Sequence, residues 1–355
     1  MISLYEKLAL WMKEKGLDAL LVSKRTNIKY FSGFGGSAGV LVITATQRKI
    51  FVDFRYVEQA TQTAPDFEVV RCKMNPVDAA AEFLQQQAFH KIGFENADMT
   101  VADFSRLTEK ISPERWGPVQ LDDFRMVKTE VEIAKISKAA AIGDSAFASI
   151  LPLIRPGVTE QTLVAALEYE MRVRGSERTA FETIVASGPR SALPHGLASG
   201  KPLESGDFVV IDFGAVFEGY HSDMTRTVCV GKASPRHREI YDIVLSAQLA
   251  GLAAIHSGAL CREVDKTARD MIESAGFGQY FGHGLGHCVG LAIHENPRLA
   301  VTAGDSILKS GMVVTVEPGI YLPGWGGVRI EDLVVVTESG CRIINQTSKE
   351  LLELG

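Results

Sequence analysis

The sequence lacks the features that mark membrane proteins and nucleic-acid-binding proteins. No apolar run approaches the roughly 20 residues of a membrane-spanning helix, and no run of five or more basic residues occurs. The formal net charge is −6, from 43 acidic and 37 basic residues. This mild acidity gives no electrostatic reason to bind nucleic acid or an anionic membrane. The first residues, MISLYEKLALWMKEKG, predict an amphipathic helix and not a signal peptide.

Cysteine is also scarce and scattered. The five cysteines are odd in number and have no C-x-x-C spacing; they are Cys72, Cys229, Cys261, Cys288 and Cys341. A disulfide framework or a structural zinc motif is therefore not expected. This cysteine usage predicts a reduced, cytoplasmic protein.

The length and the local patterns predict two domains. A chain of 355 residues that is 46% hydrophobic can bury more than one core. Residues 1–125 alternate strands and helices, which favours an α/β domain with a largely parallel sheet. Periodicity is lost in QLDDFRMV at 120–127, so we place the boundary there and assign 126–355 to the second domain. Expected helices cover about 4–15, 55–63, 77–87, 100–111, 128–154, 159–174, 237–256 and 262–274, and expected strands cover 19–22, 40–43, 50–52, 68–71 and 91–94.

One stretch of the first domain matches the G-x-S-x-G pattern of a nucleophilic serine. It reads Gly35-Gly36-Ser37-Ala38-Gly39. The chain has 33 glycines, so a chance match is expected, and the preceding NIKYFSGF is not a clear buried strand. We interpret this stretch as a flexible loop and keep a serine hydrolase based on Ser37 as an alternative.

The stretch 206–227, GDFVVIDFGAVFEGYHSDMTRT, predicts a hairpin that carries two acids. An apolar strand leads into Asp212, turn residues follow, and a second run carries Asp223. An ionised carboxylate within an apolar strand is costly, and two that face each other also repel. A bound cation removes both costs.

A second stretch repeats this design. GMVVTVEPG at 311–319 parallels GDFVVIDFG at 206–214, because in each an acid follows the first glycine by six positions. Glu317 corresponds to Asp212, and Glu331 in GGVRIEDLVVVT corresponds to Asp223. The sequence therefore predicts two related halves, each presenting two acids, whose pseudo-twofold arrangement brings all four to one centre.

The stretch between the halves is rich in histidine. FGHGLGHCVGLAIHENP at 281–297 holds three of the eight histidines, His283, His287 and His294. The first two have the spacing of a zincin helix, but the adjacent glutamate is missing and the glycines oppose a helix. We expect extended or looped backbone that brings an imidazole to a metal.

Four carboxylates and an imidazole carry too much negative charge for one ion, which favours two divalent cations. Ligands that are mostly oxygen favour Mn²⁺, with Co²⁺, Fe²⁺ or Zn²⁺ as alternatives, and they disfavour a structural zinc site. Two such cations activate water and stabilise an oxyanion, so the pattern predicts hydrolysis. The structural alternative, in which the acids cap turns and pair with Arg226 and Arg329, explains one or two of them but not five candidate ligands in matched halves.

The set Asp212, Asp223, His287, Glu317 and Glu331 resembles the metal ligands of the prolidase and aminopeptidase P branch of the pita-bread metallopeptidases. The strings SGPRSALPHG, VEPGIYLPGWGGVRIED and NIKYFSGFGGSAG extend the resemblance over nearly the whole chain. The resemblance implies a creatinase/prolidase-type α/β domain followed by an α+β pita-bread catalytic domain. Complete ligands argue against the members of the fold that lack metal, and the full first domain argues against methionine aminopeptidase.

The resemblance also implies roles for individual residues. Asp223 and Glu331 would bridge both metals, and Glu317 would also act as general base. His294 would stabilise the tetrahedral intermediate, and His195 would lie near the scissile proline nitrogen. The remaining implied residues are Asp212 and His287 as ligands, His283 in the pocket wall, Arg298 on the carboxylate of a dipeptide and Arg329 as support for Glu331.

The implied substrate is a peptide with proline in the second position. Arg298 and the overall length favour an Xaa-Pro dipeptidase, and the alternative is an Xaa-Pro aminopeptidase that acts on longer peptides. A non-catalytic binding protein using the same cleft is a further alternative, against which the intact ligand set argues. The resemblance also implies a homodimer in which the glycine-rich loop near 31–39 approaches the partner's active site.

Overall fold

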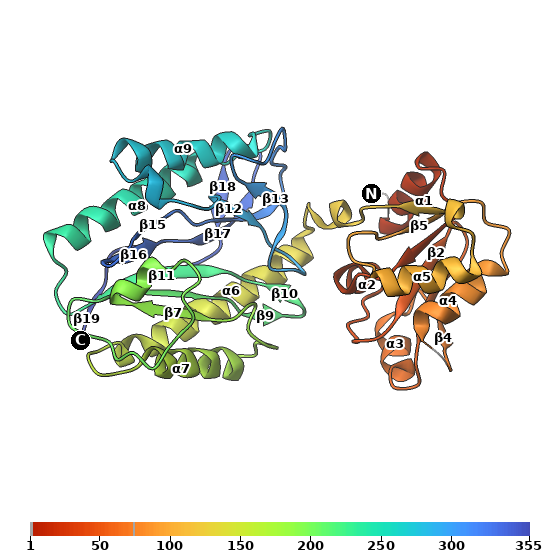
Figure 1. Ribbon diagram of the computed structural model, residues 1–355, viewed down its shortest axis with the longest axis horizontal. Helices are drawn as coiled ribbons and strands as arrows, with labels where there is room; N and C mark the ends of the chain where they lie inside the picture. Colours follow the sequence, from red (N-terminus) through yellow and green to blue (C-terminus); the bar gives the residue numbers. More distant parts are fainter. Residues whose placement is uncertain (1–2, 74) are drawn as a thin grey trace. The chain divides into compact units, whose positions relative to one another are not determined.

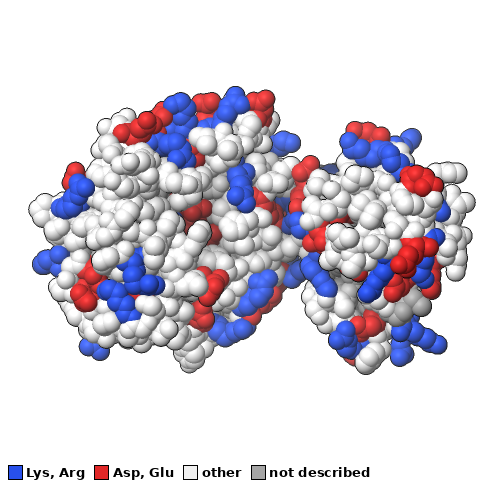
Figure 2. Space-filling view, viewed as in Figure 1, with Lys and Arg blue, Asp and Glu red and all other residues white. Residues whose placement is uncertain are grey.

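The structure, a computed structural model, describes residues 3–73 and 75–355. The chain divides into two compact units, Met1–Arg125 and Met126–Gly355 (Figure 1). Among the described residues, no helix is both long enough and apolar enough to cross a membrane. On the face drawn in Figure 2, acidic and basic side chains are interspersed over both units, with no large field of one sign.

The first unit is built on one six-stranded sheet in the order β4-β3-β2-β1-β5-β6. Its strands are β1 (Ala19–Val22), β2 (Val40–Thr44), β3 (Arg48–Val52), β4 (Glu68–Arg71), β5 (Ile92–Phe94) and β6 (Trp116–Pro118). Its helices are α1 (Leu4–Glu14), α2 (Arg25–Ser32), α3 (Val57–Thr63), α4 (Pro76–Gln85) and α5 (Val101–Lys110), with short 3-10 turns η1 (Pro113–Arg115) and η2 (Asp122–Arg125). The expected helices and strands of this unit are confirmed to within about two residues, and α2 adds a helix over most of NIKYFSGF.

Both faces of this sheet are buried. Leu20 and Val22 join one apolar cluster, with Leu8 and Met12 of α1, while the alternate residues of β1 join a second cluster with α4. Burial on both faces explains why β1 reads as the unbroken apolar run ALLV.

The expectation of a largely parallel sheet holds for three of its five strand pairings, and the other two are antiparallel. β1 pairs antiparallel with β2, and β2 pairs antiparallel with β3. Only the pairings β1–β5, β5–β6 and β3–β4 are parallel. The link between β2 and β3 is a tight turn, and parallel neighbours need a crossover of a dozen or more residues.

The second unit contains the same supersecondary arrangement twice: two helices, a strand, and then a hairpin whose tip carries a smaller hairpin. The first copy comprises α6 (Glu130–Ile150), α7 (Glu160–Val173), β7 (Ile184–Ser187), β8 (Phe208–Phe213), β9 (Val216–Phe217), β10 (Tyr220–His221) and β11 (Met224–Val230). The second comprises α8 (Pro235–Ala254), α9 (Cys261–Ser274), β12 (Gly286–Cys288), β14 (Val313–Val316), β15 (Gly319–Leu322), β16 (Gly326–Arg329) and β17 (Asp332–Val336). The remaining elements are β13 (Glu295–Leu299), β18 (Cys341–Ile343), β19 (Glu353–Leu354), η3 (Leu151–Leu153), η4 (Gly188–Ala192) and η5 (Gly278–Tyr280).

The strands of the second unit form two main sheets, in the orders β19-β11-β8-β7 and β13-β12-β14-β17-β18. In Figure 1, α6 and α7 lie on one side of the strands and α8 and α9 on the other. The helices begin at sequence-encoded caps: the hydroxyls of Thr129, Thr159 and Ser234 accept from backbone amides of α6, α7 and α8.

The alternation of side chains along the strands fixes which way the acids point. In β8, Val209, Ile211 and Phe213 pack into the apolar cluster beneath α6 and α7. Asp212 is therefore on the opposite face. In β14, Val314 and Val316 pack beneath α8 and α9, so Glu317 likewise lies on the face away from its own helices.

Candidate metal centre

The four predicted acidic ligands occupy equivalent places in the two hairpins. Asp212 lies in β8 and Glu317 directly follows β14, while Asp223 directly precedes β11 and Glu331 directly precedes β17. β8 pairs with β11 and β14 pairs with β17, both antiparallel. The halves are joined because the amide of Glu331 donates to the carbonyl of Thr225 over 3.1 Å.

All five predicted ligands lie in one cluster. Oxygen atoms of Asp212, Asp223 and Glu331 lie within 4.8 Å of one another. Nε2 of His287 lies 3.4 Å from Oε1 of Glu317 and 3.7 Å from Oδ2 of Asp223. Residues separated by more than a hundred positions thus present one nitrogen and several carboxylate oxygens to a common centre.

The cluster is buried and its negative charges repel one another. Burial raises the pKa of Asp223, and the carboxylates of Glu331, Asp212 and Glu317 raise it further. Burial followed by the charges of Glu317 and Asp212 raises the pKa of Glu331. Burial also raises the pKa of Glu317 to about 7. A bound divalent cation would lower these pKa values again, because it favours the ionised carboxylates.

Two carboxylate oxygens in the cluster have no protein partner. Within the described part of the chain, Oδ1 of Asp212 and Oε1 of Glu331 are buried without a hydrogen bond. Their sister oxygens are held: Oδ2 of Asp212 lies 2.7 Å from Nη2 of Arg329, and Oε2 of Glu331 accepts from the hydroxyl of Thr225 over 2.6 Å. Each side chain is thereby oriented with one free oxygen, as a metal ligand requires.

The imidazole of His287 is in the form that binds metal. Its Nδ1 lies 3.1 Å from the carbonyl of Cys288, which can only accept, so Nδ1 carries the proton and Nε2 carries the lone pair. Burial, followed by the neighbouring His294, lowers the pKa of His287 to about 3. The side chain is therefore neutral at pH 7, and its free nitrogen faces Asp223 and Glu317.

A cavity of about 480 Å³ opens beside the cluster. Its lining includes every predicted substrate-binding residue, namely His195, His283, His294, Arg298 and Arg329, together with Asp212, His287 and Glu317. A cavity of this size, with a few polar groups converging on it, is typical of a small-molecule site.

Tyr321 is a residue of the site that the sequence reasoning missed. The phenol of Tyr321 accepts from Nη1 of Arg329 over 2.8 Å and lies 2.9 Å from Nε2 of His283. Nδ1 of His283 lies 2.8 Å from the carbonyl of Gly284, so Nε2 is the acceptor from Tyr321. Burial lowers the pKa of His283 to about 4 and raises that of Tyr321 to about 12. The sequence offered only a weak indication of Tyr321, which is an aromatic side chain with a polar hydroxyl between the predicted ligands Glu317 and Glu331.

Three of the predicted residues are left open to a ligand. His195, His294 and Arg298 are exposed and line the cavity. Among residues 3–73 and 75–355, no side chain forms an ion pair or a hydrogen bond with the guanidinium of Arg298. A cationic group without a partner, facing a small cavity, is suited to a carboxylate.

The described residues around Ser37 do not include the partners that a nucleophilic serine needs. The hydroxyl of Ser37 is exposed and hydrogen-bonds with the phenol of Tyr56, and no described histidine contacts it. The stretch follows helix α2 and is not a strand-to-helix elbow.

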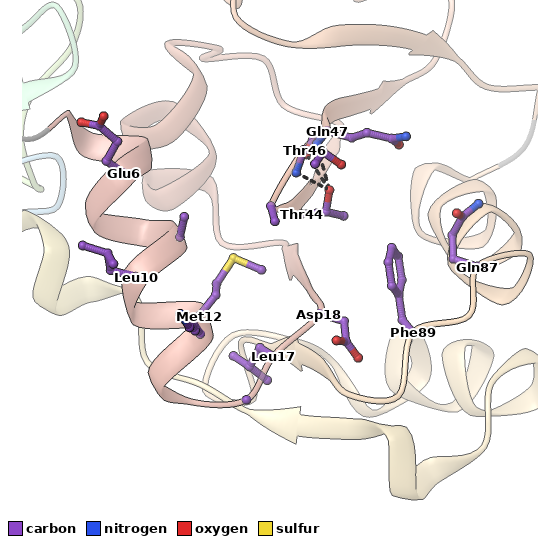
Figure 3. Close-up of a pocket in the computed structure, with 14 residues that line it drawn as sticks. Glu6, Leu10, Met12, Leu17, Asp18, Thr44, Thr46, Gln47, Gln87 and Phe89 are labelled. Carbon is purple, nitrogen blue, oxygen red and sulfur yellow. Dashed lines mark hydrogen bonds between the residues drawn. The ribbon is translucent and has the colours of Figure 1, made fainter.

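A larger cavity, of about 990 Å³, lies in the first unit. Figure 3 shows Leu10 and Met12 of α1 on one side, Thr44 and Gln47 on another, and Phe89 opposite them. The described residues that line it include no histidine or cysteine and no cluster of metal-binding groups. Size alone therefore does not identify the reactive centre.

Family models match both units. Residues 134–338 match the metallopeptidase family M24, and residues 5–127 match the creatinase/prolidase N-terminal domain. The first match covers more than half of the chain and includes all five candidate ligands.

Individual relatives match over the full length. The Xaa-Pro dipeptidase of Pyrococcus furiosus is 40% identical over 352 residues, which are 98% of this chain and 99% of the relative. Among solved structures, an Xaa-Pro dipeptidase from Bacillus anthracis superposes with a TM-score of 0.95 at 45% identity, covering 99% of each chain. An X-Pro aminopeptidase from Thermotoga maritima has a TM-score of 0.91 at 39% identity, covering 99% of this chain and 100% of its own.

Proposed function

Since this chain belongs to metallopeptidase family M24, we propose that it is a metal-dependent dipeptidase that hydrolyses Xaa-Pro bonds. The family matches confirm the predicted family and the predicted pair of a creatinase/prolidase-type domain and a catalytic domain. They also imply divalent metal ions as cofactors. The observation that carries the proposal is the convergence of five candidate ligands, two of them with unpartnered buried oxygens, beside a small cavity.

The donor set fits two divalent cations. Asp212, Asp223, His287, Glu317 and Glu331 would hold them, with Asp223 and Glu331 shared between both. Because the donors are mostly oxygen, we propose Mn²⁺ as the working metal, with Co²⁺, Fe²⁺ and Zn²⁺ as alternatives. When bound, such a pair lowers the pKa of water and stabilises negative charge on the substrate carbonyl.

The side chains around the cavity supply the proton transfers. Glu317 would accept a proton from the attacking water. That proton would pass to the proline nitrogen as the C–N bond breaks, which releases the first amino acid and proline. His294 would donate to the developing oxyanion, and His195 would lie near the proline nitrogen.

The preference for dipeptides rests on Arg298. Its guanidinium lines the cavity without a protein partner, so the carboxylate of a dipeptide can pair with it. A longer peptide would place an amide there and would leave the guanidinium unpaired. The Bacillus anthracis relative is named a dipeptidase and the Thermotoga maritima relative an aminopeptidase, so both activities must be assayed.

Purified, Mn²⁺-loaded protein should be assayed on Ala-Pro, Ala-Pro-Ala and Ala-Ala under the same conditions. We expect kcat/KM for Ala-Pro to be at least about 10-fold higher than for Ala-Pro-Ala, since one charge-assisted hydrogen bond contributes roughly 1.5–3 kcal/mol. Ala-Ala keeps the dipeptide carboxylate but lacks proline, so slower cleavage of Ala-Ala would show a requirement for proline. Equal or faster cleavage of Ala-Pro-Ala would replace the dipeptidase by the aminopeptidase. No cleavage of any peptide by fully metallated protein would favour the binding protein.

We further propose a homodimer in a reduced, cytoplasmic setting. All five cysteines are free, which suits such a setting. The glycine-rich segment that follows α2 would approach the partner's active site. A fully active protein whose mass by light scattering equals that of a single chain would contradict the proposed dimer.

A further inference from the structure

The imidazole of His294 has no side chain that fixes it directly. It is exposed, and within the described part of the chain no hydrogen bond to it is formed. Its ring contacts the ring of His287 at a centroid distance of 4.3 Å. The position of His294 must therefore be set by its backbone and by what holds its neighbours.

The next residue, Glu295, is anchored in the interior. Its side chain is 4% exposed, and Oε1 accepts from the amide of Ala292 over 3.1 Å. Glu295 also pairs in the sheet with Cys288, the residue after His287. The fit around the carboxylate is close, because a Cβ at Gly290 would lie 2.7 Å from Oε2.

One partner of Glu295 is a lysine far away in sequence. Nζ of Lys128 lies 3.1 Å from Oε2 of Glu295 and is 1% exposed. The same ammonium donates to the carbonyl of Met126 over 3.1 Å. The amide of Lys128 donates to the carbonyl of Gly311, at the start of the hairpin that carries Glu317, over 2.9 Å.

Lys128 thus connects the segment that enters the second unit with two parts of the active site. We propose that Lys128 and Glu295 are positioning residues whose buried ion pair holds the His287–His294 segment, and through it the imidazole of His294, against the cavity. This inference rests on the proposed function for its kinetic test but not for its spectroscopic test.

A buried ion pair could also serve stability alone, so the test must separate the two roles. If the pair acts through His294, its loss should change kcat/KM little in a protein that already lacks His294. If the pair only stabilises the fold, its effect on turnover should be the same with or without His294. A double-mutant cycle between Lys128→Met and His294→Ala distinguishes these outcomes.

We expect Lys128→Met to lower kcat/KM for Ala-Pro by about 10–100-fold, the usual cost of losing a supporting partner. In the His294→Ala background we expect the same change to alter kcat/KM by less than about 3-fold. A double-mutant cycle between Glu295→Gln and His294→Ala should give the same result, so the proposal can still be tested if Lys128→Met does not fold. Lys128→Arg keeps the charge and should retain most of the activity. Lys135→Met, which breaks a partly exposed pair with Glu218 in the same unit, is the control and should leave kcat/KM unchanged.

A second readout needs neither metal nor substrate. In metal-free protein with ¹⁵N-labelled histidine, the His294 imidazole signal is identified by its loss in His294→Ala. We expect it to shift or broaden in Lys128→Met and in Glu295→Gln, while His256, exposed on another segment, keeps its signal. An unchanged His294 signal, or losses of kcat/KM that simply multiply, would overturn the proposal. If the wild-type protein cleaves no Xaa-Pro peptide, the proposed function is wrong. The spectra would still show whether Lys128 and Glu295 position His294.

Discussion

Asp212 and Glu331 each use one carboxylate oxygen to bind protein and leave the other free. Arg329 holds Oδ2 of Asp212, and the hydroxyl of Thr225 holds Oε2 of Glu331. The free oxygens, Oδ1 and Oε1, are buried without a partner among the described residues. This division orients each carboxylate before a cation arrives, which reduces the entropic cost of binding.

Removing the hydroxyl of Thr225 should therefore weaken metal binding. Thr225→Val removes the donor to Glu331 but keeps the volume of a fully buried side chain. We expect the Mn²⁺ affinity measured by titration calorimetry to fall by about 10–100-fold. Thr267→Val, on the exposed face of α9, is the control. Unchanged affinity in Thr225→Val would show that this hydrogen bond does not orient Glu331.

The guanidinium of Arg298 should affect KM selectively. Arg298→Met removes the charge that we pair with the dipeptide carboxylate, so KM for Ala-Pro should rise by about 10–100-fold, equivalent to roughly 1.5–3 kcal/mol. The amide Ala-Pro-NH₂ has no carboxylate, so its kinetics should be the same in both proteins. Arg262→Met, which removes an arginine paired with Asp305 at the surface, controls for the loss of positive charge. Equal losses on both substrates would contradict the assigned role.

At the scale of the elements, the hairpins depend on close backbone approach at their tips. A Cβ placed at Gly214 would lie 1.9 Å from the carbonyl oxygen of Ser222 and 2.8 Å from Cβ of Ala180. Glycine is required there because backbone, not a movable side chain, occupies the space. This approach sets the separation of Asp212 and Asp223 across the first hairpin.

Gly214→Ala should force that hairpin open. We expect a loss of about 1–3 kcal/mol in the free energy of unfolding, as for other overpacked sites, together with weaker Mn²⁺ binding. Gly200→Ala, where a Cβ meets nothing within 4 Å, should change neither quantity. Differential scanning calorimetry and metal titration on both variants provide the measurement. Full metal affinity in Gly214→Ala would contradict the proposed link between hairpin geometry and binding.

The sequence predicted the parts of the site that have a local signature. The matched strings GDFVVIDFG and GMVVTVEPG placed Asp212 and Glu317 in equivalent hairpins, and the structure contains that repeat with its helices included. Tyr321, Thr225 and Lys128 were missed because their roles depend on which strands and segments become neighbours. The mixed pairing of the first sheet was also missed, although the short link between β2 and β3 already excluded a parallel crossover.

At the scale of the whole molecule, the cluster should make the metal-free protein less stable as the pH rises. The folded-state pKa values of Asp223, Glu331 and Glu317 are raised, the last to about 7. The folded protein therefore binds more protons than the unfolded chain between about pH 4.5 and 7, so stability falls with rising pH across this window.

Glu317→Gln should remove part of this dependence. Between pH 5 and 7.5, metal-free wild type should lose stability relative to Glu317→Gln, by an amount on the order of 3 kcal/mol. Excess Mn²⁺ should restore the stability of the wild type at pH 7.5 but not that of the variant. A cation that binds only the folded state stabilises that state. Thermal unfolding with chelator and with Mn²⁺ tests both expectations. Parallel stability curves for the two proteins would contradict the repulsion inferred in the cluster.

The central claim is that two hairpins from separate halves of the second unit form one centre for two metal ions. Anomalous diffraction from crystals of the Mn²⁺-loaded protein tests it most directly. We predict two anomalous peaks, one shared by Asp212, Asp223 and Glu331 and the other by His287, Glu317, Asp223 and Glu331. A single peak, or peaks away from these five side chains, would contradict the account.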